Sequence, residues 1–171
     1  MGMLMAAPPI YRCYKAVVGD EKDDKTRVIY MSPQGKVLTQ SKAKELSRLD
    51  RLVIICGHYE GIDERIIDEI VDEEISVGDY VLTGGELPAC IVADAVGRLC
   101  EGVLSDPECH EKESFSEGLL EYPQYTRPYD YHGMKVPDVL ISGHHENIDK
   151  WRREKSLEIT AARRPDLLKK D

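Results

Sequence analysis

The feature that most constrains the fold is an unbroken apolar run at residues 52–56, which stops abruptly at Gly57. A continuous apolar run of this length is typical of a strand covered on both faces, as in a parallel sheet. Beyond the glycine, large aliphatic side chains recur at helical spacing: Ile62, Ile66, Ile67, Ile70 and Val71. A buried strand followed by an amphipathic helix predicts one unit of an α/β fold.

The same alternation continues on both sides of this unit. Residues 26–31 are rich in strand formers and end in a turn signal at 32–35, and residues 42–46 are strong helix formers. A short strand is expected at 74–77. The helix after it has Pro88 in its first turn and apolar residues along one face: Leu87, Ile91, Val92, Ala95, Val96 and Leu99. The pattern predicts an open parallel sheet with helices.

The C-terminal third reads differently. Residues 105–116 are polar and aperiodic, which favours a linker or a lid, and residues 122–128 are extended and bounded by prolines. A helix is expected from about 147 to 157, with Ile148, Trp151 and Lys155 along one side. Residues 20–25 are charged and are expected to form a mobile loop.

Composition excludes several classes of protein. Five cysteines without a C-x-x-C pair argue against a disulfide framework and against a zinc site. No apolar run is long enough to cross a bilayer and no secretory signal is visible, so a cytoplasmic protein without membrane contact is expected. The net charge of −9 disfavours a nucleic-acid partner, but residues 150–171 carry eight basic and four acidic side chains. That basic tail fits a phosphate-binding surface or simply a solvated helix.

Three glycine-bearing segments follow the expected strands: 32–35, 57–61 and 78–85. In an open α/β sheet, ligands bind beyond the carboxyl ends of the strands, and glycines there let a ligand approach the main chain. None of the segments fits G-x-G-x-x-G or the P-loop pattern. Each alone fits a tight turn, whereas three in register favour a ligand the size of a nucleoside.

Six blocks of sequence carry a resemblance to a known family. They are GMLM (2–5), YMSPQG (30–35), CGHYEGIDER (56–65), SVGDYVLTGGELP (76–88), GLLEYPQYTRP (118–128) and VPDVLISGHH (136–145). In order and spacing this chain resembles the bacterial tRNA (guanine-N1)-methyltransferases from Gly2 to at least Leu168. The family's usual N-terminal strand, helix and D-x-P-Y-G-G-G loop are absent here, as is the end of its C-terminal domain.

The resemblance implies a SPOUT-class α/β fold: an open parallel sheet with helices on both faces, a deep C-terminal trefoil knot and a small helical C-terminal domain. It implies a knotted cofactor-binding domain at 1–104, a linker or lid at 105–120 and a partial tRNA-binding domain at 121–171. S-adenosylmethionine would be held by the two later glycine segments, in a homodimer with each active site at the subunit interface. The implied cofactor residues are Tyr30, Pro33, Gly57, Tyr59, Glu60, Val77, Gly78, Asp79, Tyr80, Val81, Leu82, Gly84, Gly85 and Glu121.

The family's catalytic residues carry over to Arg98 and Glu113. A carboxylate is needed to remove the N1 proton of guanine, and a guanidinium stabilises the charge that develops toward O6. Glu113 stands where the family usually has aspartate. Taken without the resemblance, Arg98 is a cation at a helix end and Glu113 is a solvated surface residue, while Asp63 is a helix N-cap.

The implied activity is methyl transfer to N1 of the guanosine immediately 3′ of the anticodon in tRNA. A magnesium requirement is left open, because nothing in the sequence indicates a metal site. The absent segments favour a folded dimer that binds the cofactor with impaired or absent transfer. Three alternatives remain: a non-catalytic remnant that binds cofactor or RNA, another SPOUT RNA methyltransferase, and, more distantly, a Rossmann-type oxidoreductase, which the missing dinucleotide fingerprint disfavours.

Overall fold

The fold was analysed in a computed structural model that describes residues 3–104 and 113–169. The chain divides into two compact units, Met1–Ser105 and Asp106–Asp171, and each is treated by itself. Cys109 and most of the expected linker lie outside the described residues.

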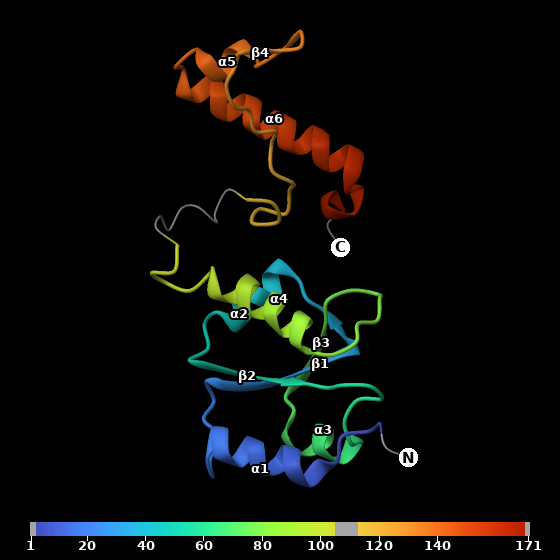
Figure 1. The fold of residues 1–171 in the computed structure, drawn as a ribbon. Coiled ribbons are helices and arrows are strands. Elements are labelled where there is room, and N and C mark those ends of the chain that lie inside the picture. The colour runs from blue at the N-terminus through green and yellow to red at the C-terminus, as the bar shows by residue number, and fades with distance from the viewer. Residues whose placement is uncertain (1–2, 105–112, 170–171) are drawn as a thin grey trace. The chain divides into compact units, whose positions relative to one another are not determined.

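The first unit is an α/β structure built on a three-stranded parallel sheet in the order β2-β1-β3 (Figure 1). Its strands are β1 (Thr26–Val37), β2 (Arg51–Cys56) and β3 (Glu73–Ser76). Its helices are α1 (Ala7–Val18), α2 (Gln40–Leu46), α3 (Glu64–Ile70) and α4 (Glu86–Gly97). The parallel sheet with helices on both sides confirms the coarse fold class.

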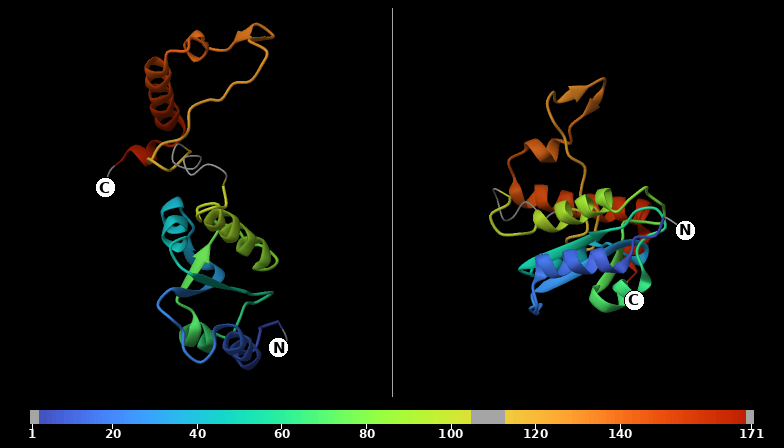
Figure 2. Two further views of the ribbon diagram at one scale, coloured as in Figure 1. Left: turned by 90° about the vertical axis from the view of Figure 1, so that its left-hand side faces the viewer. Right: turned by 60° about the horizontal axis from the view of Figure 1, so that its bottom comes forward.

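Helices α2 and α4 lie on one side of the sheet and α1 and α3 on the other (Figures 1 and 2). Each face of the sheet has its own apolar cluster. On the side of α2 and α4, Ile29, Ile75 and Val92 are fully or almost fully buried. On the side of α1 and α3, Ile66 packs with Tyr30 and Ile70. Burial on both faces is the arrangement that a parallel sheet requires.

Two expectations about the strands need correction. The segment 32–35 is not a turn after a strand, because β1 continues to Val37 with a register shift between Met31 and Lys36. This path requires glycine at position 35, because a Cβ there would lie 2.4 Å from the carbonyl carbon of Glu74 and would clash with it. The apolar run 52–56 is an edge strand of half-buried residues, and β1 is the central strand.

The helices also depart from expectation at several points. The sequence analysis did not anticipate α1, which begins with two prolines in its first turn, a position where proline is favourable. In α4 the buried residues are Pro88, Val92 and Val96, whereas Leu87 and Ile91 are 65% and 45% exposed. The apolar residues of α4 therefore occupy two faces, and only one of them packs on the sheet.

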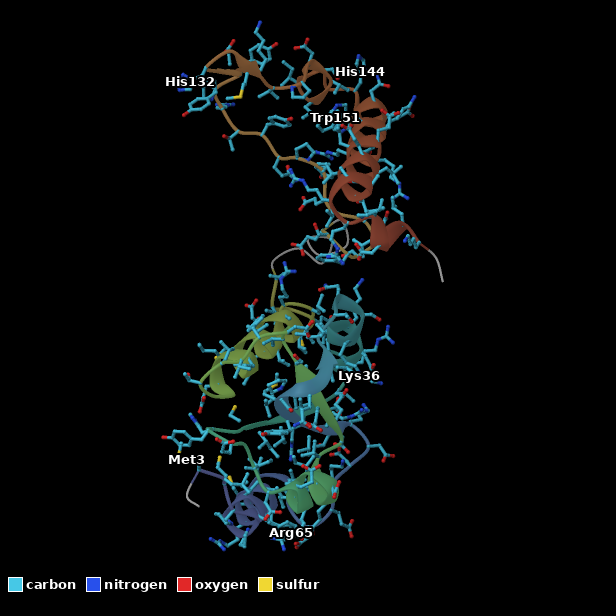
Figure 3. All side chains as sticks on the ribbon, turned by 90° about the vertical axis from the view of Figure 1, so that its right-hand side faces the viewer. Met3, Lys36, Arg65, His132, His144 and Trp151 are labelled. Atoms are coloured by element: carbon cyan, nitrogen blue, oxygen red, sulfur yellow. The ribbon has the colours of Figure 1, made fainter. Side chains whose placement is uncertain are left out.

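The second unit contains a short antiparallel hairpin, two helices and a terminal 3-10 turn. These are β4 (Asp130–Tyr131), β5 (Met134–Lys135), α5 (Asp138–Ile141), α6 (His145–Arg163) and η2 (Pro165–Leu168). Helix α6 is longer than the expected 147–157, and Ile148, Ser156 and Thr160 are its buried residues. Trp151 lies half-buried on α6, with its ring 6.3 Å from that of Tyr125 (Figure 3).

Two further observations concern membrane-spanning helices and metal sites. In the part of the chain that the structure describes, no helix is long and apolar enough to span a membrane. The same residues contain no group of three or more histidine, cysteine or acidic side chains placed to hold a metal ion. Four of the cysteines are free: Cys13, Cys56, Cys90 and Cys100.

Candidate active site

A cavity of the first unit lies at the carboxyl ends of β2 and β3 and beside the bulged part of β1, and has a volume of about 310 Å³. Its walls are the bulged part of β1, the loop 57–61 after β2 and the loop 77–85 between β3 and α4. All three glycine-bearing segments therefore meet at one place, as the strand order of a parallel sheet predicts.

The cavity gathers most of the residues that the resemblance implies for the cofactor. They are Tyr30, Pro33, Gly57, Tyr59, Glu60, Val77, Gly78, Tyr80, Val81, Leu82, Gly84 and Gly85. Two of the implied residues do not line it. Asp79 is exposed in the loop beside the cavity, and Glu121 belongs to the second unit.

The two glycine loops are bonded to each other through their main chains. Gly85 N–H donates to the carbonyl oxygen of Gly57 at 2.9 Å, and His58 forms an isolated antiparallel bridge with Gly84. A Cβ on Gly85 would lie 2.7 Å from the Cα of Cys56. Only glycine therefore permits the approach of these loops at that position.

The Tyr30 side chain packs against the loop 57–61. Its hydroxyl would lie 2.8 Å from a Cβ on Gly57 and 2.9 Å from one on Gly61, so both glycines leave room for the phenol. Burial raises the pKa of Tyr30, and the nearby carboxylate of Glu74 adds to the rise. Tyr30 thus stays a neutral phenol at the base of the cavity.

The N-terminal segment anchors the same loop from the other side. Met5 N–H donates to Gly61 at 2.9 Å and Asp63 N–H donates to Met5 at 3.0 Å, which makes a short parallel bridge between Met5 and Ile62. Glu60 N–H donates to the carbonyl oxygen of Met3, which lies beside this loop (Figure 3). The sequence analysis gave no sign of this contact, because it joins segments distant in the chain.

Asp63 is the N-cap of α3, as the sequence analysis expected. Its carboxylate accepts from Arg65 N–H at 3.0 Å and forms a two-point ion pair with the Arg65 guanidinium, at 2.9 and 2.7 Å. The Arg65 side chain first, and then the Arg65 backbone N–H, lower the pKa of Asp63 to about 2. Asp63 therefore fixes the start of α3 next to the cavity loop.

The sequence analysis overlooked a side-chain contact between the two glycine loops. His58 Nε2 lies against Glu86 Oε1, which joins the loop 57–61 to the first turn of α4. The backbone N–H of Glu86 first, and then the His58 side chain, lower the pKa of Glu86. His58 and Glu86 both belong to the sequence blocks named above. They are 28 positions apart in the chain, so their contact cannot be predicted from local sequence.

The residues implied in catalysis are divided between the units. Arg98 is half-buried and forms the C-cap of α4, its N–H donating to Asp94 at 3.1 Å. Glu113 is half-buried in the second unit, where it lines a small cavity of about 240 Å³ together with Glu121. Glu121 Oε1 accepts from Gln124 Nε2 at 2.6 Å. Neither acidic residue is the solvated side chain that charge pattern alone favours.

The sequence matches a known protein family along almost its whole length. The model of the tRNA (Guanine-1)-methyltransferase family TrmD matches residues 1–170. The chain belongs to this methyltransferase family. The tRNA (guanine-N(1)-)-methyltransferase of Ruminiclostridium cellulolyticum is 62% identical over 169 residues, which is 99% of this chain and 72% of that protein.

Two further relatives have the same printed name, tRNA (guanine-N(1)-)-methyltransferase. The protein of Clostridioides difficile is 57% identical, with 99% of this chain and 73% of its own length aligned. That of Lachnospira eligens is 58% identical, with 97% and 70% aligned. As a member of this methyltransferase family, the chain is expected to use a methyl donor.

Proposed function

We propose that this chain transfers a methyl group from S-adenosylmethionine to N1 of the guanosine immediately 3′ of the anticodon in tRNA. The observation that carries the proposal is the 62% identity to a tRNA (guanine-N(1)-)-methyltransferase over 99% of the chain. The cavity at the strand ends supports it, because the implied cofactor residues of three separate segments line the same space.

The cavity suits the donor in size and in lining. Its volume of about 310 Å³ is within the usual range of ligand sites, roughly 300–1,000 Å³. Gly57, Gly84 and Gly85 line the cavity without side chains, so a purine can approach the main chain of these loops closely. The apolar walls come from Val77, Val81 and Leu82. When bound, S-adenosylmethionine supplies an electrophilic methyl group.

The protein's own residues perform the proton chemistry. Glu113 acts as the general base that takes the N1 proton of guanine, because the protonated nitrogen is a poor nucleophile. Arg98 places a permanent positive charge near O6, where negative charge develops as N1 loses its proton. Glu113 has one methylene more than the aspartate usual in the family, so its carboxylate is carried on a longer arm.

The contact between the two glycine loops supports a knotted topology. The loops 57–61 and 77–85 are bonded through Gly57 and Gly85 and enclose one cavity. We propose that the chain forms the trefoil knot of the SPOUT class at these loops. A knot of this kind fixes both cofactor loops at once, although threaded chains are rare among proteins.

The exposed apolar residues near the cavity support a homodimer. Val81 is 83% exposed, Tyr59 75% and Leu87 65%, and all three are on or next to the glycine loops. Apolar side chains gathered at a site are typical of an interaction surface. We propose that a second copy covers them and completes each active site, with the helical second unit holding the RNA through the cations of α6.

Methyl transfer from labelled donor to unmodified tRNA tests the function. Two transcripts are compared, one with G and one with A immediately 3′ of the anticodon. Label is expected in the G transcript alone. Prior methylation of that guanosine at N1 is expected to abolish the labelling. Label at a ribose hydroxyl, or equal label in both transcripts, would contradict the proposal.

A further inference from the structure

The side chains of His58 and Glu86 join the two cofactor loops outside the main-chain contact. His58 is on the loop 57–61, and Glu86 is the first residue of α4, directly after the loop 77–85. Their contact lies beside the hydrogen bond from Gly85 to Gly57 and the bridge between His58 and Gly84. The two loops are thus held together by one side-chain pair and by their backbones.

The side chains of His58 and Glu86 also pack against one wall of the cavity. A Cβ on Gly84 would lie 2.5 Å from Glu86 Oε2 and 2.8 Å from His58 Cε1. Both side chains therefore pack directly against the main chain of Gly84, which lines the cavity. His58 lines the cavity as well, whereas Glu86 stands behind it. A change in either side chain moves a wall that the cofactor touches.

The exposed fractions of the two side chains argue against a role in the stability of the fold. The His58 and Glu86 side chains are 45% and 57% exposed, and ion pairs so open to water contribute little to the stability of a fold. Glu86 is in the first turn of α4, where its own backbone N–H and the helix dipole favour the carboxylate. Tyr59 contributes the neighbouring ring, 5.9 Å from that of His58. The pair is therefore suited to setting loop position.

We infer that His58 and Glu86 form a latch that positions the two glycine loops for S-adenosylmethionine, so that both are positioning residues of the cofactor site. The inference rests on the proposed function. In the latched state the loops are already ordered, so the cofactor does not have to order them when it binds. Without the latch the loops are ordered only on binding, and affinity falls.

Calorimetric titration of the full chain with S-adenosylmethionine tests the latch. His58→Ala and Glu86→Ala are each expected to raise the dissociation constant about two- to fivefold, the size of effect expected for an exposed pair. The double variant is expected to bind no more weakly than either single one, because both changes remove the same contact. His58→Gln keeps a donor toward Glu86 and is expected to recover most of the affinity.

A matched control and a kinetic comparison separate positioning from general damage. Lys15→Ala breaks another surface ion pair of the same unit, with Asp20, and is expected to bind the cofactor as wild type. In methyl transfer, the KM for the donor is expected to rise with the dissociation constant while kcat falls far less. Unchanged affinity in both alanine variants, or effects that multiply in the double variant, would overturn the latch.

Hydrogen exchange in the ligand-free protein separates this inference from the proposed function. Loss of the latch is expected to speed amide exchange in 57–61 and 77–85 by about two- to fivefold, with other segments unchanged. Faster exchange in a chain that binds no S-adenosylmethionine would refute the proposed function and the cofactor role but leave the loop contact standing. Unchanged exchange and unchanged affinity in an active enzyme would refute the latch alone.

Discussion

Gly85 donates its backbone N–H to the carbonyl oxygen of Gly57 at 2.9 Å, which joins the start of α4 to the end of β2. The approach is so close that a Cβ on Gly85 would lie 2.7 Å from the Cα of Cys56 and 3.0 Å from Gly57 N. Neither of these is the end of a flexible side chain, so the main chain itself would have to move.

Gly85→Ala is therefore expected to destabilise the protein by roughly 1–3 kcal/mol, the usual cost of overpacking, and to weaken binding of S-adenosylmethionine. Gly97→Ala in the same helix is the control, because a Cβ there meets nothing within 4 Å. It is expected to stabilise by about 0.4–1 kcal/mol. Thermal unfolding with and without S-adenosylmethionine measures both. Equal stability of the two variants would contradict the close approach.

Thr160 is expected to be the main polar anchor of the second unit. It is fully buried; its hydroxyl accepts from Leu120 N–H at 2.9 Å and donates to the Ser156 carbonyl at 2.6 Å. Thr160→Val leaves the Leu120 N–H unpaired and should cost roughly 1–3 kcal/mol. Thr160→Ser keeps the hydroxyl and should cost less. Urea unfolding followed by the fluorescence of Trp151, the only tryptophan, reports on this unit.

The cap of α3 should make stability depend on pH in the acid range. Asp63 has its pKa lowered to about 2, so its folded value is below its unfolded value near 3.9. Its contribution is complete above about pH 4 and is lost as the pH falls through about 2. Asp63→Ala is expected to lower the melting temperature at pH 7 and to match wild type near pH 2.

Asp68→Ala provides the comparison for that experiment, since Asp68 is exposed on the same helix. It should change the melting temperature little at either pH. A constant difference between wild type and Asp63→Ala from pH 7 to pH 2 would rule out the proposed role of the carboxylate.

Glu113 and Arg98 should affect transfer more than cofactor binding. Glu113→Gln removes the proposed base and is expected to slow single-turnover methyl transfer by about 10²–10⁴. Arg98→Gln removes the charge proposed at O6, for a loss of roughly 10²–10³. Glu113→Asp, which restores the residue usual in the family, should retain activity. Glu117→Gln nearby is the control, because Glu117 is paired with Arg153 on the surface. Wild-type rates in Glu113→Gln would exclude it as the base.

Much of the fold follows from local pattern. The unbroken apolar run before Gly57, the spaced isoleucines of α3 and the Asp63 cap were enough to predict strand, helix and N-terminus, because each depends on neighbours in the chain. The resemblance added the list of cofactor residues, and the structure brings all of them but Asp79 and Glu121 to one cavity. Their roles in binding and in catalysis stay predictions.

Long-range packing accounts for what the sequence analysis missed. It placed a turn at 32–35, but pairing of Lys36 and Val37 with β3 keeps the chain extended there. It expected one apolar face on α4, but Val92, Ala95 and Val96 pack in the core while Leu87 and Ile91 are exposed. Such differences arise because tertiary contacts override local preference.

The sequence by itself determined the alternation of strands and helices from β1 to α4 and the three glycine segments, because periodicity and backbone freedom are properties of neighbouring residues. The tertiary structure alone decided that β1 is the central strand, that Met5 pairs with Ile62 and that His58 meets Glu86. Each of these depends on segments that are far apart in the chain and that the sheet brings together. Contacts of this kind leave no local pattern in the sequence.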